Sequence, residues 1–149
     1  MSVNVIYSTQ AISKGGRNRS VETVDGSFFS AVSVPREIGG DDAPGVNAEQ
    51  LFASGYAACF HGTMKFITTQ FAHLTVSDAA SVTATVGVGP REQGGFGLQV
   101  DLRVALPDLD ASSADELVRR THEVCPYSNA IRDNVEVNVI VDAGAALIA

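Results

Sequence analysis

Two cysteines, Cys59 and Cys125, are the residues of this chain best suited to redox chemistry. A thiolate is a strong nucleophile, and once oxidised it can condense with a second thiol to form a disulfide. No Cys-x-x-Cys motif is present, and two cysteines without a secretion signal do not predict a scaffold of permanent disulfides. Each cysteine is therefore either an inert apolar filler of the core or half of a redox pair that opens and closes.

A reactive Cys59 needs a cation nearby. The free thiol pKa of about 8.5 falls only beside a positive charge or at a helix N-terminus. Cys59 lies roughly three turns inside a predicted helix, too far from its start to gain much from the helix dipole. Arg17 or Arg19, on a glycine-opened loop, can supply the charge. Glu49, in the first turn of the same helix, is a candidate partner for such an arginine.

Cys125 stands directly before Pro126, at the end of a second predicted helix. Proline pushes the residue before it out of helical geometry, so this thiol is predicted to lie at a bend rather than inside a packed turn. The histidines lack the Cys/His grouping of a zinc site, and we expect no bound metal; they are His61, His73 and His122.

The helix that carries Cys59 is the element around which the chain is organised. It is predicted from Ala48 to about Ala72, with Asn47 as N-cap and Gln50 completing a capping box. Its first half is almost entirely apolar, which predicts a buried helix and suggests contact with a second subunit. One face carries small residues that let another backbone come close, at Gly55, Cys59 and Gly62.

The remaining elements are mostly strands. Alternating apolar residues predict a first strand at residues 3–7, a hairpin at 21–24 and 28–34 around Asp25-Gly26, a second hairpin at 82–88 and 98–104, and a closing strand at 135–141. A helix is predicted from a capping box at Ser113–Glu116, and residues 143–149 are expected to fray. The order predicts a single α+β domain over residues 1–149, with antiparallel sheets packed around a long buried central helix. The loop of the second hairpin presents Phe96 as an apolar side chain.

Composition excludes several classes of function. The chain has 149 residues, 45% of them hydrophobic and 18% charged, which fits one domain with a real core. A net charge of −7 argues against binding to nucleic acid or to an anionic membrane surface. His61 and Lys65 interrupt the apolar run at residues 51–67, so we expect no membrane span. The first residues show no signal peptide, and we expect a cytoplasmic protein.

Two long segments resemble the signature segments of the organic hydroperoxide resistance proteins. They are residues 47–60 (NAEQLFASGYAACF) and 124–130 (VCPYSNA), and three short motifs at residues 15–17, 25–26 and 94–98 follow the same pattern in the same order. The resemblance runs from about residue 5 to residue 141. These proteins are thiol peroxidases of the larger family shared with osmotically inducible protein C, and they act in the response to oxidative stress.

The resemblance implies a role for each candidate residue. Cys59 resembles the peroxidatic cysteine and Cys125 the resolving cysteine, which together form an intramolecular disulfide. Arg17 resembles the arginine that stabilises the thiolate, and Glu49 the carboxylate that orients it. The implied substrate is an organic hydroperoxide, and our candidates for its apolar lining are Phe96 and Tyr127.

The resemblance also implies partners. The implied reductant is dihydrolipoamide or a lipoylated protein, with no metal, flavin or haem, and the implied assembly is an intertwined homodimer with active sites near the subunit interface.

The sequence departs from the family pattern at two places near the site. Ala48 replaces a proline at the start of the helix, and Arg19 stands where the pattern prefers glycine. Arg19 is expected either to stiffen the loop or to compete with Arg17 as the partner of Glu49. Two alternatives remain beside the peroxidase for organic hydroperoxides. One is a peroxidase of the osmotically inducible type with a different peroxide preference, and the other is a non-catalytic redox-sensing dimer.

Overall fold

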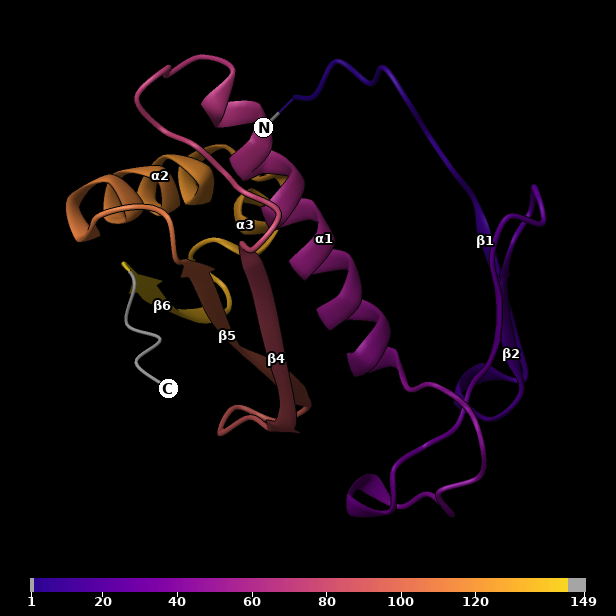
Figure 1. The fold of residues 1–149 in the computed structure, drawn as a ribbon. Helices are drawn as coiled ribbons and strands as arrows, with labels where there is room; N and C mark the ends of the chain where they lie inside the picture. The colour runs from indigo at the N-terminus through magenta and orange to yellow at the C-terminus, as the bar shows by residue number, and fades with distance from the viewer. Residues whose placement is uncertain (1, 145–149) are drawn as a thin grey trace. The chain divides into compact units, whose positions relative to one another are not determined.

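The computed structural model describes residues 2–144 of the chain, which divides into two compact units, Met1–Leu51 and Phe52–Ala149. The elements in chain order are β1 (Ala11–Lys14), β2 (Ser20–Thr23), β3 (Phe29–Ala31), α1 (Ala48–Thr68), β4 (Ser81–Pro90), β5 (Phe96–Leu106), α2 (Ala111–Val124), α3 (Pro126–Ile131) and β6 (Glu136–Ala143) (Figure 1). Two three-stranded sheets and helices confirm the predicted α+β class. Among residues 2–144, no helix has the length and apolarity that crossing a membrane requires.

The sheet of the N-terminal unit has the order β1-β2-β3, with both pairs antiparallel. The predicted hairpin around Asp25-Gly26 is confirmed by β2 and β3. The Asp25 carboxylate accepts hydrogen bonds from the backbone N–H and hydroxyl of Ser27, which lower the pKa of Asp25 to about 2. The strand predicted at residues 3–7 is wrong. An alternating apolar pattern shows which side chains share one face of a strand, but it does not show which strand lies beside it. Residues 11–14, and not residues 3–7, pair with β2.

Helix α1 begins as the sequence predicts. The Asn47 side chain accepts from the Gln50 backbone N–H at 2.7 Å, and the Gln50 side chain accepts from the Asn47 backbone N–H at 2.9 Å, which completes the capping box. The helix ends at Thr68 rather than near residue 72. The hydroxyls of Thr68 and Thr69 donate to backbone carbonyls three residues earlier, in competition with the helical pattern.

Asn47→Ala is expected to lower the free energy of unfolding by about 1 kcal/mol, because it leaves an N-terminal backbone N–H of α1 without its acceptor. Urea unfolding at a fixed protein concentration measures the change. The matched control is Ser54→Ala on the same helix, which removes an exposed side chain and is expected to change stability by less than about 0.5 kcal/mol. A loss no larger than that of the control would contradict the capping role.

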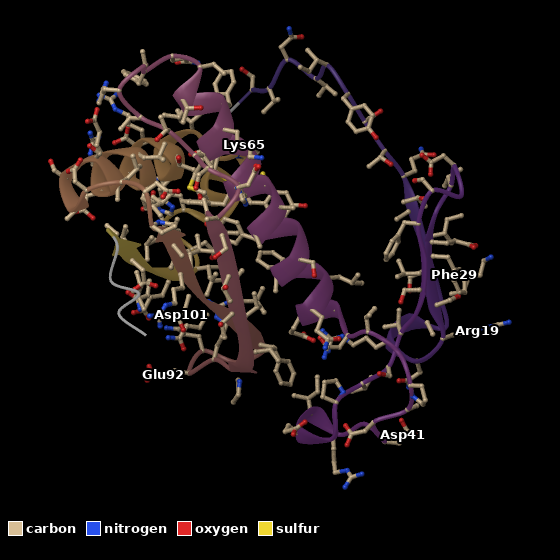
Figure 2. All side chains as sticks on the ribbon, viewed as in Figure 1. Arg19, Phe29, Asp41, Lys65, Glu92 and Asp101 are labelled. Atoms are coloured by element: carbon tan, nitrogen blue, oxygen red, sulfur yellow. The ribbon has the colours of Figure 1, made fainter. Side chains whose placement is uncertain are left out.

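The sheet of the C-terminal unit places β5 between β4 and β6 (Figure 1). The predicted hairpin is confirmed by β4 and β5, which pair in antiparallel fashion from Ser81↔Ala105 to Pro90↔Phe96. Figure 2 shows Glu92 at the tip of this hairpin. The prediction of purely antiparallel sheets is wrong for β6, which runs parallel to β5. Helices α2 and α3 connect the two strands, and such a crossover returns the chain in the same direction.

Helix α2 begins earlier than the sequence predicts. Asp110 is its N-cap, and its carboxylate accepts from the backbone N–H and the hydroxyl of Ser113, so Ser113 is the third helical residue. The helix ends before Pro126 as predicted, and Pro126 opens the short α3, which the sequence did not predict. Of the tail predicted to fray, residues 145–149 lie outside the described part of the chain.

The core of the C-terminal unit joins α1 and α2 to one face of the sheet. Its members are buried apolar side chains from these three elements: Tyr56, Phe60, Met64 and Ile67 from α1, Val100, Leu102, Val104 and Leu106 from β5, and Ala114, Leu117 and Val118 from α2. Alternate residues of β5 point into this core, which is the period of two that its sequence predicted. Burial of Cys125 in the same cluster places one thiol inside this core.

Candidate active site

The structure brings the two sulfurs together in the C-terminal unit. Cys59 Sγ and Cys125 Sγ lie 3.7 Å apart, and both cysteines are free thiols. A disulfide bond is about 2.05 Å long, so a modest approach of the two sulfurs would close the bond. Cys125 is completely buried, whereas Cys59 is partly exposed. The two thiols therefore differ in access, and only Cys59 is open to a molecule arriving from solvent.

The bend at Pro126 positions the buried thiol. Cys125 follows the last residue of α2 and is the N-cap of α3. Its backbone N–H donates to the carbonyl of Thr121 at 2.8 Å, and its carbonyl accepts from the N–H of Asn129 at 2.9 Å. The residue is therefore hydrogen-bonded to both helices. Proline prevents the chain from continuing α2 through Cys125, and the Sγ meets that of Cys59 on α1.

Burial of Cys59 by the C-terminal unit raises the pKa of its thiol and so favours the protonated form. Desolvation is the largest influence on this group and raises its pKa above the ordinary thiol value, and proximity to Cys125 raises it further. A hydrogen bond from the backbone N–H of Tyr127 acts in the opposite direction, but the net pKa is still raised. A thiol in this state is a poor nucleophile at neutral pH, so its activation requires a positive charge.

The arginine and carboxylate candidates also meet, in the N-terminal unit. Arg17 lies in a short 3-10 helix, Gly16–Asn18, and its Nη2 donates to Glu49 Oε1. The Glu49 side chain is only 12% exposed, and its Oε2 is buried without a hydrogen-bond partner. That oxygen is available to a further donor, and an unsatisfied buried carboxylate oxygen is costly unless one arrives.

Arg19 does not take the place of Arg17. Gly15 has a φ of +73°, and a Cβ at that position would lie 2.7 Å from the Cβ of Arg19, so glycine is required there for both reasons. Figure 2 shows the Arg19 side chain extending away from the strands. Arg19 takes part in none of the ion pairs formed by residues 2–144.

An aromatic cluster lies on the two segments that carry the cysteines, and it includes Tyr127, one of the two aromatic candidates from the sequence. Tyr127 is 40% exposed, and its ring lies 6.2 Å from that of Phe52 and 5.9 Å from that of Tyr56. Its hydroxyl would be 3.1 Å from a Cβ added to Gly55, so the notch predicted in α1 accommodates this ring. Phe96 is 75% exposed at the first residue of β5 and is not a member of this group. Phe52 and Tyr56, which precede Cys59 on the same helix, pack against Tyr127 and were not among the candidates from the sequence.

The histidines near the cysteines are half-buried. His61 Nε2 and His122 Nδ1 are both buried without a hydrogen-bond partner. Burial lowers the pKa of His122, which favours its neutral form. Within residues 2–144, no three His, Cys, Asp or Glu side chains come together as metal ligands would.

Several proteins with similar sequences and structures are named organic hydroperoxide resistance protein. The family described as OsmC-like protein matches residues 39–140. The organic hydroperoxide resistance protein of Xanthomonas axonopodis pv. citri (strain 306) is 43% identical over 135 residues, which cover 91% of this chain and 94% of that protein.

Two solved structures extend the likeness to the fold. An organic hydroperoxide resistance protein from Elizabethkingia anophelis superposes with a TM-score of 0.87 at 38% identity, covering 95% of this chain and 99% of the other. The organic hydroperoxide resistance protein OhrB of Bacillus subtilis gives a TM-score of 0.82 at 33% identity, with 93% and 100% covered.

Proposed function

Because the chain belongs to the OsmC-like family, and within it to the organic hydroperoxide resistance proteins, we propose that it is a thiol-dependent peroxidase that reduces organic hydroperoxides to alcohols. The observation that carries the proposal is the pair of sulfurs 3.7 Å apart with unequal access to solvent. A peroxidase of this type needs an accessible thiol to meet the peroxide and a protected thiol to close the cycle.

The proposed reaction uses both thiols as a two-electron donor. The thiolate of Cys59 attacks one peroxide oxygen, the O–O bond breaks, and the alkoxide leaves as the alcohol after taking up a proton. Cys59 is then a sulfenic acid. The sulfur of Cys125 attacks that of Cys59, and the sulfenic hydroxyl leaves as water with the proton released by Cys125. One peroxide has been reduced, and the two thiols have become one disulfide.

The Arg17–Glu49 pair is proposed to activate the peroxidatic thiol. Burial raises the pKa of Cys59, and a guanidinium is a permanent cation that also offers several hydrogen-bond donors to a peroxide oxygen. Glu49, mostly buried, fixes the orientation of Arg17. Tyr127, whose backbone N–H donates to the Cys59 sulfur and whose ring packs near Phe52, suits an organic rather than an inorganic peroxide. Phe96 stays a proposed contact from the hairpin.

The cycle requires an external dithiol that reduces the disulfide by thiol exchange. We propose a lipoyl dithiol, free or protein-bound, as this reductant, with no metal, flavin or haem, and a homodimer as the working assembly. The exposed apolar side chains of the N-terminal unit, Ile12 and Phe29 among them, are consistent with a surface that a second copy covers. Figure 2 shows Phe29 on its strand.

Titration of thiols after peroxide addition tests the proposal. One equivalent of cumene hydroperoxide is expected to remove both free thiols of the reduced protein, and dihydrolipoamide should then restore them and sustain turnover. Free thiols that persist after the peroxide is added would contradict the peroxidase assignment. Oxidation without turnover would indicate a redox sensor, and a preference for another peroxide over cumene hydroperoxide would indicate the osmotically inducible type.

Arg17→Ala is expected to raise the pKa of the Cys59 thiol by about one to two pH units, because it removes the proposed cation. The thiolate forms as pH rises through this pKa, so the pH midpoint of Cys59 alkylation should move upward. The measurement is the rate of alkylation against pH in a Cys125→Ser background. Arg19→Ala is the matched control and should leave the midpoint unchanged, and a shift in the control alone would reassign the role to Arg19.

A further inference from the structure

A buried pair of hydroxyls links the same two segments as the sulfurs. Tyr56 Oη and Ser128 Oγ lie 2.8 Å apart, and the two residues are 0% and 1% exposed. Tyr56 belongs to α1 and Ser128 to α3. No part of the reaction proposed above uses either hydroxyl.

Each of the two hydroxyl-bearing residues is three positions from a cysteine in the sequence, which is about one helical turn. Tyr56 precedes Cys59 by three residues on α1, and Ser128 follows Cys125 by three residues at the start of α3. Residues three apart on a helix lie on the same side of it. The hydroxyl bond and the sulfur contact are therefore two neighbouring links between α1 and α3. Tyr127, packed against Gly55, lies beside them and shows how closely the two segments approach.

The choice of hydroxyls in this place has a physical reason. A pair of apolar side chains would fill the same volume, but it would not fix the register of α3 on α1, whereas a buried hydrogen bond is directional. Burial raises the pKa of Tyr56, so its phenol stays protonated and continues to serve in this bond while thiols titrate.

Disulfide formation is the step most sensitive to this register. The sulfurs must close from 3.7 Å to about 2.05 Å, while the segment that carries Cys125 is held by a helix of only six residues. We propose that Tyr56 and Ser128 are positioning residues, and that their hydroxyl bond holds Cys125 against Cys59 so that the second thiol resolves the oxidised first one before another oxidant reaches it. The inference rests on the proposed peroxidase function for its biological meaning but not for its test.

The test measures resolution without peroxide. Methyl methanethiosulfonate converts the accessible Cys59 thiolate into a methyl disulfide and releases methanesulfinate. Cys125 then attacks the Cys59 sulfur, closes the protein disulfide and expels methanethiol. Intact-mass sampling in time gives the rate at which the adduct forms and the rate at which it is resolved. Tyr56→Phe and Ser128→Ala each break the hydroxyl bond with little change in volume, and Ser54→Ala removes an exposed hydroxyl on α1 as control.

Both single variants are expected to slow resolution by about tenfold while adduct formation changes by less than about twofold. The double variant should be no slower than the slower single variant, because both remove one shared bond. Ser54→Ala should behave as wild type. Resolution at the wild-type rate in a folded Tyr56→Phe or Ser128→Ala protein would overturn the proposal, as would additive effects in the double variant. No peroxide is used in this experiment. The resolution rates can therefore be interpreted even if the protein proves not to be a peroxidase.

Discussion

Cys59→Ser is expected to abolish the consumption of organic hydroperoxide, with a loss of at least about a thousandfold in kcat/KM. A serine hydroxyl is far less acidic than a thiol and cannot be oxidised to a sulfenic acid under these conditions. Cys125 does not substitute for it, because that thiol is completely buried. Peroxide remaining in solution, followed by a colorimetric assay with dihydrolipoamide in excess, measures the effect.

The design distinguishes a lost nucleophile from a lost fold. Serine is close in size to cysteine, and Cys59 is partly exposed, so the variant is expected to unfold near the wild-type urea concentration. Appreciable turnover by a folded Cys59→Ser protein would show that another group attacks the peroxide. In that case Cys125 would be the first thiol to examine, by alkylation in the presence of peroxide.

With one equivalent of peroxide, Cys125→Ser is expected to react once at close to the wild-type rate and then to stop turning over. The first step requires Cys59 alone, but the sulfenic acid it leaves has no second thiol 3.7 Å away to form a disulfide. With excess peroxide the sulfenic acid should proceed to sulfinic and sulfonic acids, which thiol reductants do not reverse. Intact-mass spectra should therefore show stepwise addition of oxygen atoms at Cys59, and steady-state turnover should fall by at least about a hundredfold.

Cys125→Ala serves as the matched variant. Serine leaves a hydroxyl in a fully buried apolar site, whereas alanine leaves a small gap, so the two variants perturb the core by different means. Agreement between them in the single turnover and in oxygen addition would attribute the effect to the missing sulfur. If either protein stalled with an unmodified Cys59, the roles of the two cysteines would be reversed.

Local sequence signals determined much of the architecture. The capping box of Asn47 and Gln50 predicted where α1 begins, the Asp25-Gly26 turn predicted the first hairpin, and Pro126 predicted the end of α2. These features depend on hydrogen bonds and dihedral preferences within a few residues, so the sequence carries them in readable form. The prediction of thiol chemistry had a different source, the resemblance of residues 47–60 and 124–130 to a family pattern.

The errors concern choices between distant partners. Residues 3–7 have the alternating pattern of a strand, but Ala11–Lys14 pair with β2 in their place. Strand β6 runs parallel to β5 because two helices connect them. In both cases two arrangements satisfy the local pattern, and packing selects between them. The cap of α2 is instead a local error, because Asp110 accepts from the Ser113 backbone N–H and takes the position that Ser113 was predicted to hold.

The geometry of the candidate site also depends on packing between elements that are distant in the sequence. The sequence and its family resemblance nominated the candidate residues, namely Cys59, Cys125, Arg17 and Glu49. Only the tertiary structure decided that the sulfurs, 66 residues apart in the chain, lie 3.7 Å from each other, that Glu49 pairs with Arg17 rather than Arg19, and that a buried hydroxyl pair stands beside the sulfurs. Contacts of this kind depend on how whole elements pack against one another, and neither spacing nor propensity within one segment encodes them.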